Sequence, residues 1–368
     1  MPTTSALAVR ARRFFPLDRQ LQLRRDHWSE GAARVATRLG LQSKSFDQAA
    51  ASFTDAVGQS ISGDSVERIT EGWGRRVEAQ RAAEAEQANA PAQRGEGPTT
   101  RRLAEQDPIA GAANISTDGG MVLIRGERWK EVKLTAISEV EVRPAEERPV
   151  QEGRAGRRAG DLVVTLKGHS YQAGLWDADT MALHQYAEGL RRGLDRCPQL
   201  SSVNDGAPWI ERITSLNFPA ATQIVDWSHA EGKLWTVGKA VFGEQSPQGR
   251  GWVEAQLDRL WCGAAHQVAA ALRRLDLDQA RLPDEVRQAP GYFEGNRQRM
   301  RYDQFRAQGY PIGSGTVESG INTVVHHRMK RPGQGWKRSN AQAMLAALAE
   351  LHSSRFERTW QATLPRAA

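Results

Sequence analysis

Between residues 114 and 166 apolar and polar side chains alternate, and this two-residue period constrains the fold more than any other feature of the chain. The clearest run has five apolar residues of one parity, Val132, Leu134, Ala136, Val140 and Val142. Successive side chains of a strand point to opposite faces, so the alternation predicts strands with one buried face. The segment NISTDGGMVLI (114–124) predicts a short strand, a turn at Asp118-Gly119-Gly120 and a second strand, and DLVVTL (161–166) predicts another.

Helical segments follow these strands. Residues 178–194 have the spacing of an amphipathic helix, and strand, turn and helix signals recur around SSVNDGAPWI (201–210) and ATQIVDW (221–227), although the former is less apolar than a buried strand usually is. The pattern is helical again over about 230–296, from Thr316, and over 338–358. Early strands followed by alternating strands and helices predict an α/β protein, with a mixed sheet and helices on its faces.

The N-terminal residues 1–77 predict an all-α domain that contains a helix-turn-helix. The first of its two helices has Ala49, Phe53 and Val57 on one face and ends at Gly58, and the second can be capped by Ser62 or Asp64. Three arginines lie along or just beyond the second helix: Arg68, Arg75 and Arg76. A recognition helix in a DNA major groove needs such a basic surface, and an ordinary helical hairpin is the alternative interpretation.

Composition shifts divide the rest of the chain. Residues 78–112 predict a fraying helix and a flexible linker, and RPAEERPVQEGRAGRRAG (143–160) predicts a low-complexity hairpin loop. We expect three further parts, which are a sheet-containing part (113–229), a helical insertion (230–309) and a set of C-terminal helices (310–368).

Charge and cysteine content limit the possible function classes. The chain has 50 Lys and Arg against 43 Asp and Glu, a net charge of +7, which suits a polyanionic partner such as DNA. Its two cysteines, Cys197 and Cys262, form no CxxC pair, so a sulfur-based zinc site and a disulfide framework are not expected. No run of about 18 apolar residues occurs, so we expect no membrane span.

Three acidic residues stand where strands are expected to end or a helix to begin. Asp118 precedes two glycines, Asp205 precedes Gly206, and Glu318 follows Gly313-Ser314-Gly315 in the first turn of a helix. Phosphoryl transfer by two magnesium ions needs hard oxygen ligands, which Asp and Glu supply. Each Asp-Gly pair alone is more typical of a simple turn, so only the combination of the three acids indicates a metal site.

The segment DWSH, from Asp226 to His229, brings both side chains to one face if a helix begins there. His229 is then a candidate metal ligand, proton donor or DNA contact, and a structural histidine satisfied by Asp226 is the alternative.

Basic residues follow Glu318, and we take three of them, with a nearby tryptophan, as candidate DNA contacts: Arg328, Lys330, Arg331 and Trp336. The alternative for this strip is a solvated basic face.

The order of these motifs resembles that of transposases of the ISKra group of bacterial insertion sequences, which are related to the Mutator-like DDE transposases. The resemblance rests on STDGG, VNDGAPWI, VDWSHAEGKLW and, as its most specific part, the segment 296–336 with RMRY, PIGSG, VE, RMK and GW. It implies an RNase H-like catalytic domain interrupted by a helical insertion, and a catalytic, metal-binding triad at Asp118, Asp205 and Glu318. DWSH resembles the C/DxxH motif of related families, and Asp226 is the alternative to Asp205 as the second triad member.

The resemblance also implies a reaction and partners. We expect a transposase that cuts DNA strands at the ends of an insertion sequence and joins them to target DNA, using two Mg2+ ions with Mn2+ as a substitute. Its partners would be double-stranded terminal repeats and target DNA, with a homo-oligomer assembled on the DNA in the cytoplasm, at the nucleoid. A structure-specific nuclease of the same fold and a catalytically silent DNA-binding remnant are the competing hypotheses. Family members often carry extra N-terminal sequence with cysteines, so the resemblance implies a copy shortened at that side.

Overall fold

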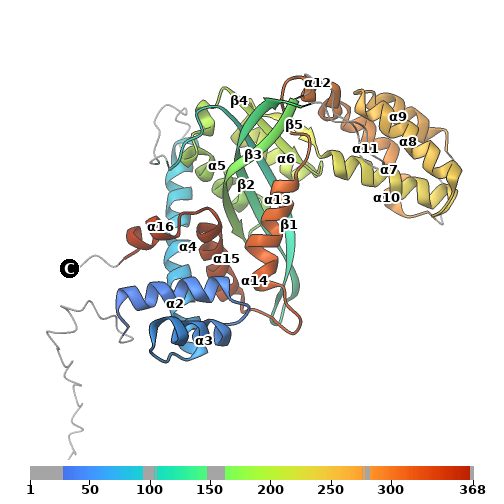
Figure 1. Ribbon diagram of the computed structural model, residues 1–368. Coiled ribbons are helices and arrows are strands. Elements are labelled where there is room, and N and C mark those ends of the chain that lie inside the picture. The colour runs from blue at the N-terminus through green and yellow to red at the C-terminus, as the bar shows by residue number, and fades with distance from the viewer. Residues whose placement is uncertain are drawn as a thin grey trace, which may run out of the picture. The chain divides into compact units, whose positions relative to one another are not determined.

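A computed structural model describes residues 28–93, 103, 106–146, 162–275, 277 and 282–364. The chain divides into two compact units, Met1–Gly72 and Trp73–Ala368. Figure 1 shows the elements of both units with their labels, and each unit is described by itself. Among the described helices, none combines the length and the apolar character that crossing a membrane would demand.

The first unit contains α2 (Glu30–Gln42), α3 (Phe46–Val57) and the start of α4 (Gly63–Gln93). The hydroxyl of Ser45 caps α3 by accepting the Gln48 N–H at 3.1 Å, and Gly58 ends it in the left-handed region at φ 73°. Both helices of the predicted helix-turn-helix are therefore confirmed as helices. The helix expected at the start of residues 78–112 is the continuation of α4, which runs without a break to Gln93.

A five-stranded mixed sheet forms the centre of the second unit, with strand order β3-β2-β1-β4-β5. β1, β2 and β3 are antiparallel neighbours, whereas β4 pairs with β1 and β5 with β4 in parallel. The strands are β1 (Ala112–Ile124), β2 (Arg128–Pro144), β3 (Leu162–Gly174), β4 (Gln199–Asn204) and β5 (Thr222–Val225). This confirms the predicted α/β class and the mixed sheet.

The predicted turn at residues 118–120 is absent, because β1 runs through it as one strand of 13 residues. Asp118 pairs with Leu134 and Gly120 with Val132 in the same antiparallel ladder. The chain reverses at residues 125–127, where Gly126 has φ 80°. Glycine can adopt that angle without strain, so the reversal uses Gly126 and leaves the two earlier glycines extended.

Helices cover both faces of the sheet. α5 (Ala178–Arg191) contacts β2 and β3, and its Gln185 donates to the Thr117 hydroxyl at 3.1 Å. Gly120, of opposite parity on β1, lies against Ile321 of the helical segment that begins with α13 (Gly315–Gly320). Alternate residues of a strand point to opposite faces, so α5 and this segment lie on opposite sides of the sheet (Figure 1). α6 (Pro208–Asn217) packs on α5.

The low apolar content of SSVNDGAPWI follows from a ladder of side-chain hydrogen bonds between β1 and β4. Ser201 donates to the Asn114 amide oxygen at 3.0 Å, and Asn114 donates to Ser116 at 2.9 Å. Asn204 donates to Ser202 at 2.7 Å. Buried polar groups are tolerated when they are hydrogen-bonded, so these strands remain in the interior with few aliphatic residues.

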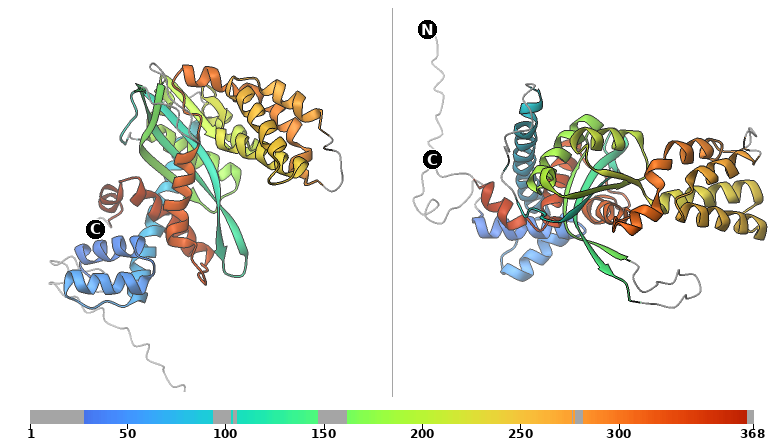
Figure 2. Two further views of the ribbon diagram at one scale, coloured as in Figure 1. Left: turned by 45° about the vertical axis from the view of Figure 1, so that its right-hand side comes forward. Right: turned by 90° about the horizontal axis from the view of Figure 1, so that it is seen from above.

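A helical insertion separates β5 from α13, and it lies beside the sheet next to the ends of β4 and β5 (Figure 2). Its main helices are α7 (Trp227–Phe242), α8 (Pro247–Trp261), α9 (Ala265–Arg273), α10 (Asp284–Arg287), α11 (Ala289–Gly295) and α12 (Tyr302–Ala307). Trp252 packs on Phe242 and Trp261 packs edge-on against Trp227. The predicted helical character of this segment is thus confirmed, and two of its tryptophans make aromatic contacts.

The long C-terminal helix predicted over 338–358 is in fact two helices, α15 (Arg338–His352) and α16 (Phe356–Ala362). The break includes Ser354, a non-glycine residue with φ 57°. At this break Arg355 turns its side chain inward, where 2% of the side chain is exposed. The break therefore serves to bring a guanidinium into the interior.

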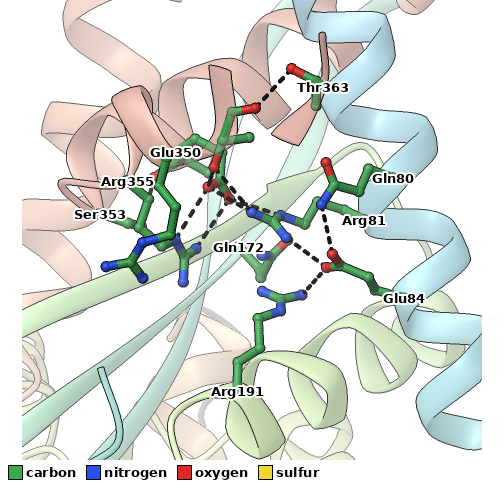
Figure 3. Close-up of polar contacts among 12 residues, drawn as sticks. Gln80, Arg81, Glu84, Gln172, Arg191, Glu350, Ser353, Arg355 and Thr363 are labelled. Atoms are coloured by element: carbon green, nitrogen blue, oxygen red, sulfur yellow. Dashed lines mark hydrogen bonds and ion pairs between the residues drawn. The ribbon is translucent and has the colours of Figure 1, made fainter. Parts of the chain in front are cut away.

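That guanidinium belongs to a buried network of three arginines and three glutamates, drawn in part in Figure 3: Arg81, Arg191, Arg355, Glu84, Glu188 and Glu350. Arg355 bonds to Glu188 at 2.7 Å and to Glu350 at 3.1 Å, and Arg81 on α4 lies 2.7 Å from Glu350. Burial alone would raise the pKa of Glu350, but Arg355 and Arg81 outweigh it and hold the pKa at about 2. Ion pairs between the three arginines and the three glutamates therefore connect α4, α5 and α15, and their charges sum to zero.

Candidate metal centre

Asp118 lies on β1 just beyond the point where β4 stops pairing, at Ile115 and Ser202. Its side chain is half-buried and accepts a hydrogen bond from the N–H of Gly119 at 2.7 Å. Burial raises the pKa of Asp118 and the bond from Gly119 lowers it, while the charges of Asp205 and Glu318 raise it and His229 lowers it. The charges of Asp205, His229 and Glu318 thus all act on Asp118.

Asp205 follows β4 directly and is held from two directions. Its carboxylate accepts the N–H of Ala207 at 2.8 Å, and its backbone carbonyl accepts the hydroxyl of Tyr292, on α11, at 3.1 Å. Gly206 has φ 91°, and a Cβ there would lie 3.4 Å from the ring of Tyr292. The Asp-Gly pair is therefore a turn, and its glycine is required by the positive φ, since a Cβ would make only an ordinary contact with Tyr292.

The side chain of Asn204, which the sequence did not single out, joins the strands that carry the acids. Its amide oxygen accepts the N–H of Thr117 at 2.6 Å, and its backbone carbonyl accepts the N–H of Asp226 at 2.7 Å. Asn204 is 7% exposed. It therefore satisfies the strand N–H next to Asp118 at the place where β1 and β4 separate, and it fixes the start of the segment after β5.

Replacing Asn204 with alanine is expected to lower the free energy of unfolding by about 1–3 kcal/mol, because the buried N–H of Thr117 loses its acceptor. Urea denaturation measures the loss, and faster hydrogen exchange at the Thr117 amide locates it. The control is Ser202→Ala, which removes only the acceptor of the Asn204 side-chain N–H. Equal losses in the two variants would contradict a specific role for the bond to Thr117.

Asp226 is buried, with 1% exposure, and all of its oxygens are engaged. One oxygen accepts the N–H groups of Ser228 at 2.5 Å and His229 at 3.4 Å, which caps α7. The other accepts the N–H of Ser314 at 2.7 Å and also the Ser314 hydroxyl. Four such bonds make Asp226 a link between α7 and the start of α13, whereas the carboxylate of Asp205 accepts the N–H of Ala207.

Glu318 and His229 face each other across this link. Ser314 precedes α13, which carries Glu318 one turn later, and the Ser314 hydroxyl lies 3.4 Å from the Glu318 carboxylate. Nε2 of His229 lies 3.8 Å from Oε1 of Glu318, and both side chains are nearly half exposed, at 44% and 48%. The ligand atoms of Asp226, His229 and Glu318 all fall within 4.8 Å of one another, a spacing that could hold a metal ion.

Two glycines allow the helical segment that carries Glu318 to lie close to the sheet. A Cβ at Gly120 would meet Ile321 at 2.9 Å, and one at Gly320 would meet Tyr171 at 2.8 Å. After α13 the helix widens into a π-helical turn, Ile321–His326, before α14 (His327–Met329). Such π turns are rare and are frequently found at functional sites.

The insertion is anchored to the same strand ends by two tyrosines. Besides the bond from Tyr292 to Asp205, the buried Tyr302 donates to the carbonyl of Val225 at 2.9 Å. Tyr302 is the tyrosine of the RMRY motif, so the structure gives that motif a physical role in fixing the insertion beside β5.

The predicted DNA contacts after Glu318 divide into buried and exposed residues. Arg328 and Trp336 are 3% and 5% exposed, and the guanidinium lies over the indole ring at 5.3 Å. The indole N–H donates to the carbonyl of Met329 at 3.1 Å. The prediction of surface contacts is therefore wrong for these two residues, whose cation–π pair closes the interior. Lys330 is exposed, and Arg331 is half-buried with its guanidinium bonded to the His327 carbonyl.

The N-terminal arginines lie along α4. Arg68 and Arg75 are exposed, whereas Arg76 is half-buried.

A comparison with protein-family models gives no match for the chain, and neither does a comparison with curated proteins.

Proposed function

We propose that this chain is a DDE-type transposase with an RNase H-like catalytic domain, which cleaves DNA strands at the ends of an insertion sequence and joins them to target DNA. The observation that carries the proposal is that the charges of Asp205 and Glu318, from two other segments of the chain, act on Asp118, while the ligand atoms of Glu318 lie within 4.8 Å of those of Asp226 and His229. A five-stranded mixed sheet, followed by a helical segment that precedes the last acid, supports the same assignment.

The donor set fits divalent cations. Asp118 has a raised pKa because it is partly buried and because two further carboxylates repel its charge. The acids are oxygen donors, which Mg2+ prefers, and Mn2+ accepts the same ligands. Asp118 and Asp205 would hold one ion and Glu318 the other, and bound ions would supply charge stabilisation at the attacking and leaving oxygens.

The reaction consists of two displacements at phosphorus. In the first, water replaces the bridging oxygen of a strand at the element end and frees a 3′-hydroxyl. In the second, that hydroxyl replaces the bridging oxygen of a target strand, so one bond forms as one breaks. The protein's own contribution is positional: Asn204 and Asp226 hold the segments that carry the three acids in one arrangement.

DNA binding would use the basic residues that the structure leaves accessible. On α4 these are Arg68 and Arg75, and after Glu318 they are Lys330 and, in part, Arg331. Contacts of lysine and arginine with phosphates give affinity that falls with salt and carries little sequence information. We propose double-stranded terminal repeats and target DNA as partners, with more than one copy of the chain on the DNA.

The test is strand transfer of a labelled, pre-cut duplex, made from the DNA that flanks the coding sequence, into a supercoiled plasmid. The wild type is expected to join the two with Mg2+ or Mn2+ but not with EDTA, and Asp118→Ala and Glu318→Ala are expected to lose joining while still binding the duplex. Cleavage without joining would indicate a nuclease of the same fold. Binding with neither reaction under either metal would indicate a DNA-binding remnant and would refute the proposal.

A further inference from the structure

Among the described residues, His229 is the nitrogen donor beside Glu318, and its backbone is held there by the buried carboxylate of Asp226. Asp226 fixes the first turn of α7 by accepting the N–H of His229, and it fixes the start of α13 by accepting both donors of Ser314. Since His229 and Glu318 each lie within one turn of these anchors, a single buried carboxylate sets the 3.8 Å distance between them. The pair is thus pre-organised before any ligand binds.

The side chains of this pair have little other use in the fold. Among the described contacts, the imidazole ring of His229 has only Glu318 as an ion-pair partner, and its charge also acts on Asp118. Asp226, the third group within 4.8 Å, already accepts four hydrogen bonds and would have to give some up to bind a metal. The ligand atoms that need no rearrangement are therefore one imidazole nitrogen and one carboxylate, and the charges of both act on Asp118.

The pair is also reachable from solvent. His229 and Glu318 both line an open groove of about 430 Å³ that continues along α7 past Gly232 and Thr236. Lys233 and Glu285 also line this groove, which leaves the pair open to solvent.

We propose that His229 and Glu318 form a mixed nitrogen–oxygen metal site, so that the ion held at Glu318 is a transition-metal ion in preference to Mg2+. This inference rests on the proposed function, because it names the cofactor of the same centre. Imidazole suits Fe2+, Ni2+, Cu2+ and Zn2+, and Mn2+, which mainly takes oxygen ligands, also accepts a nitrogen donor, whereas Mg2+ takes hard oxygen ligands and binds imidazole poorly. An all-carboxylate centre would lack this preference.

The experiment compares Mn2+ and Mg2+ binding to the full chain by calorimetry, with pulsed electron paramagnetic resonance of the Mn2+ complex. The wild type is expected to show coupling of Mn2+ to an imidazole nitrogen. In His229→Gln the coupling disappears and Mn2+ affinity falls about tenfold or more, while Mg2+ affinity changes little. The control is His266→Gln, an exposed histidine on α9, which keeps both the coupling and the affinity.

The outcomes separate this inference from the proposed function. If Mn2+ binds with Glu318-dependent affinity but shows no nitrogen coupling, or if His229→Gln weakens Mn2+ and Mg2+ equally, the nitrogen site is refuted and the carboxylate centre stands. If neither ion binds the wild type, both are refuted. Unchanged thermal melting of His229→Gln shows that a loss of affinity is not a loss of fold.

Discussion

Replacing Glu350 with glutamine is expected to lower the free energy of unfolding by about 3–5 kcal/mol at neutral pH, because it removes one member of a buried ion network. Glu350 is fully buried and bonds to Arg81, Arg355 and Thr359. Glutamine has nearly the same shape, but its neutral amide leaves two buried guanidinium groups short of compensating charge. Urea denaturation monitored by circular dichroism measures the difference.

The pH dependence of this loss provides an internal check. The pKa of Glu350 is depressed in the folded protein to about 2, from a usual value of 4.5, so its charge stabilises the fold above pH 4.5. That contribution is lost as the pH falls toward 2, and the gap between wild type and Glu350→Gln should narrow over this range. Glu127→Gln, which disrupts the exposed pair with Arg338, should change stability little at any pH. A constant gap down to pH 2 would contradict the assigned role.

Local periodicity predicted most elements of this fold, because it reports which face of a segment is buried. The alternation over 130–142 gave β2, and the spacing of Ala49, Phe53 and Val57 gave α3. The predicted turn at Asp118 failed for a physical reason. Glycine tolerates both extended and turn conformations, and only pairing with β2, a tertiary contact, decides between them.

The buried charges could not be predicted, because their partners are far apart in the sequence. Arg81 and Glu350 are separated by 269 residues, and nothing local distinguishes either from a surface residue. Arg328 and Trp336 were misplaced on the surface for the same reason, since a basic strip looks alike whether it is solvated or stacked on an indole. The three acids were easier to find, because glycines mark their positions in the sequence.

The roles of Asn204 and Ser314 could not be predicted from the sequence, although both residues lie in recognised motifs. Both lie within the motifs VNDGAPWI and PIGSG, yet their function is visible only as bonds to Thr117 and Asp226 on other segments. Positional residues of this kind carry no chemical signature, since asparagine and serine are equally common in turns. The sequence therefore predicts candidate acids, whereas the groups that hold their segments in place are visible only in the structure.

The choice between Asp205 and Asp226 leads to opposite expectations for the two matched asparagine variants. Asp205→Asn is expected to reduce strand transfer about 100-fold or more, since a metal-binding carboxylate contributes several kcal/mol to transition-state stabilisation. Its unfolding free energy should change little, because an amide oxygen at residue 205 can still accept the N–H of Ala207. Strand-transfer rate and urea denaturation are measured on the same preparations.

Asp226→Asn should show the reverse pattern. Asparagine is as good a helix N-cap as aspartate, so α7 should still begin at Trp227. The new side-chain NH2 group, however, faces the N–H and the hydroxyl of Ser314. The buried N–H of Ser314 is left without an acceptor, which costs about 1–3 kcal/mol of stability, whereas the Ser314 hydroxyl can still donate to Glu318, and the acids Asp118, Asp205 and Glu318 remain. Joining should therefore persist at a reduced rate and keep its metal dependence. Full loss of joining in a stably folded Asp226→Asn, with activity retained in Asp205→Asn, would instead make Asp226 the second member of the triad.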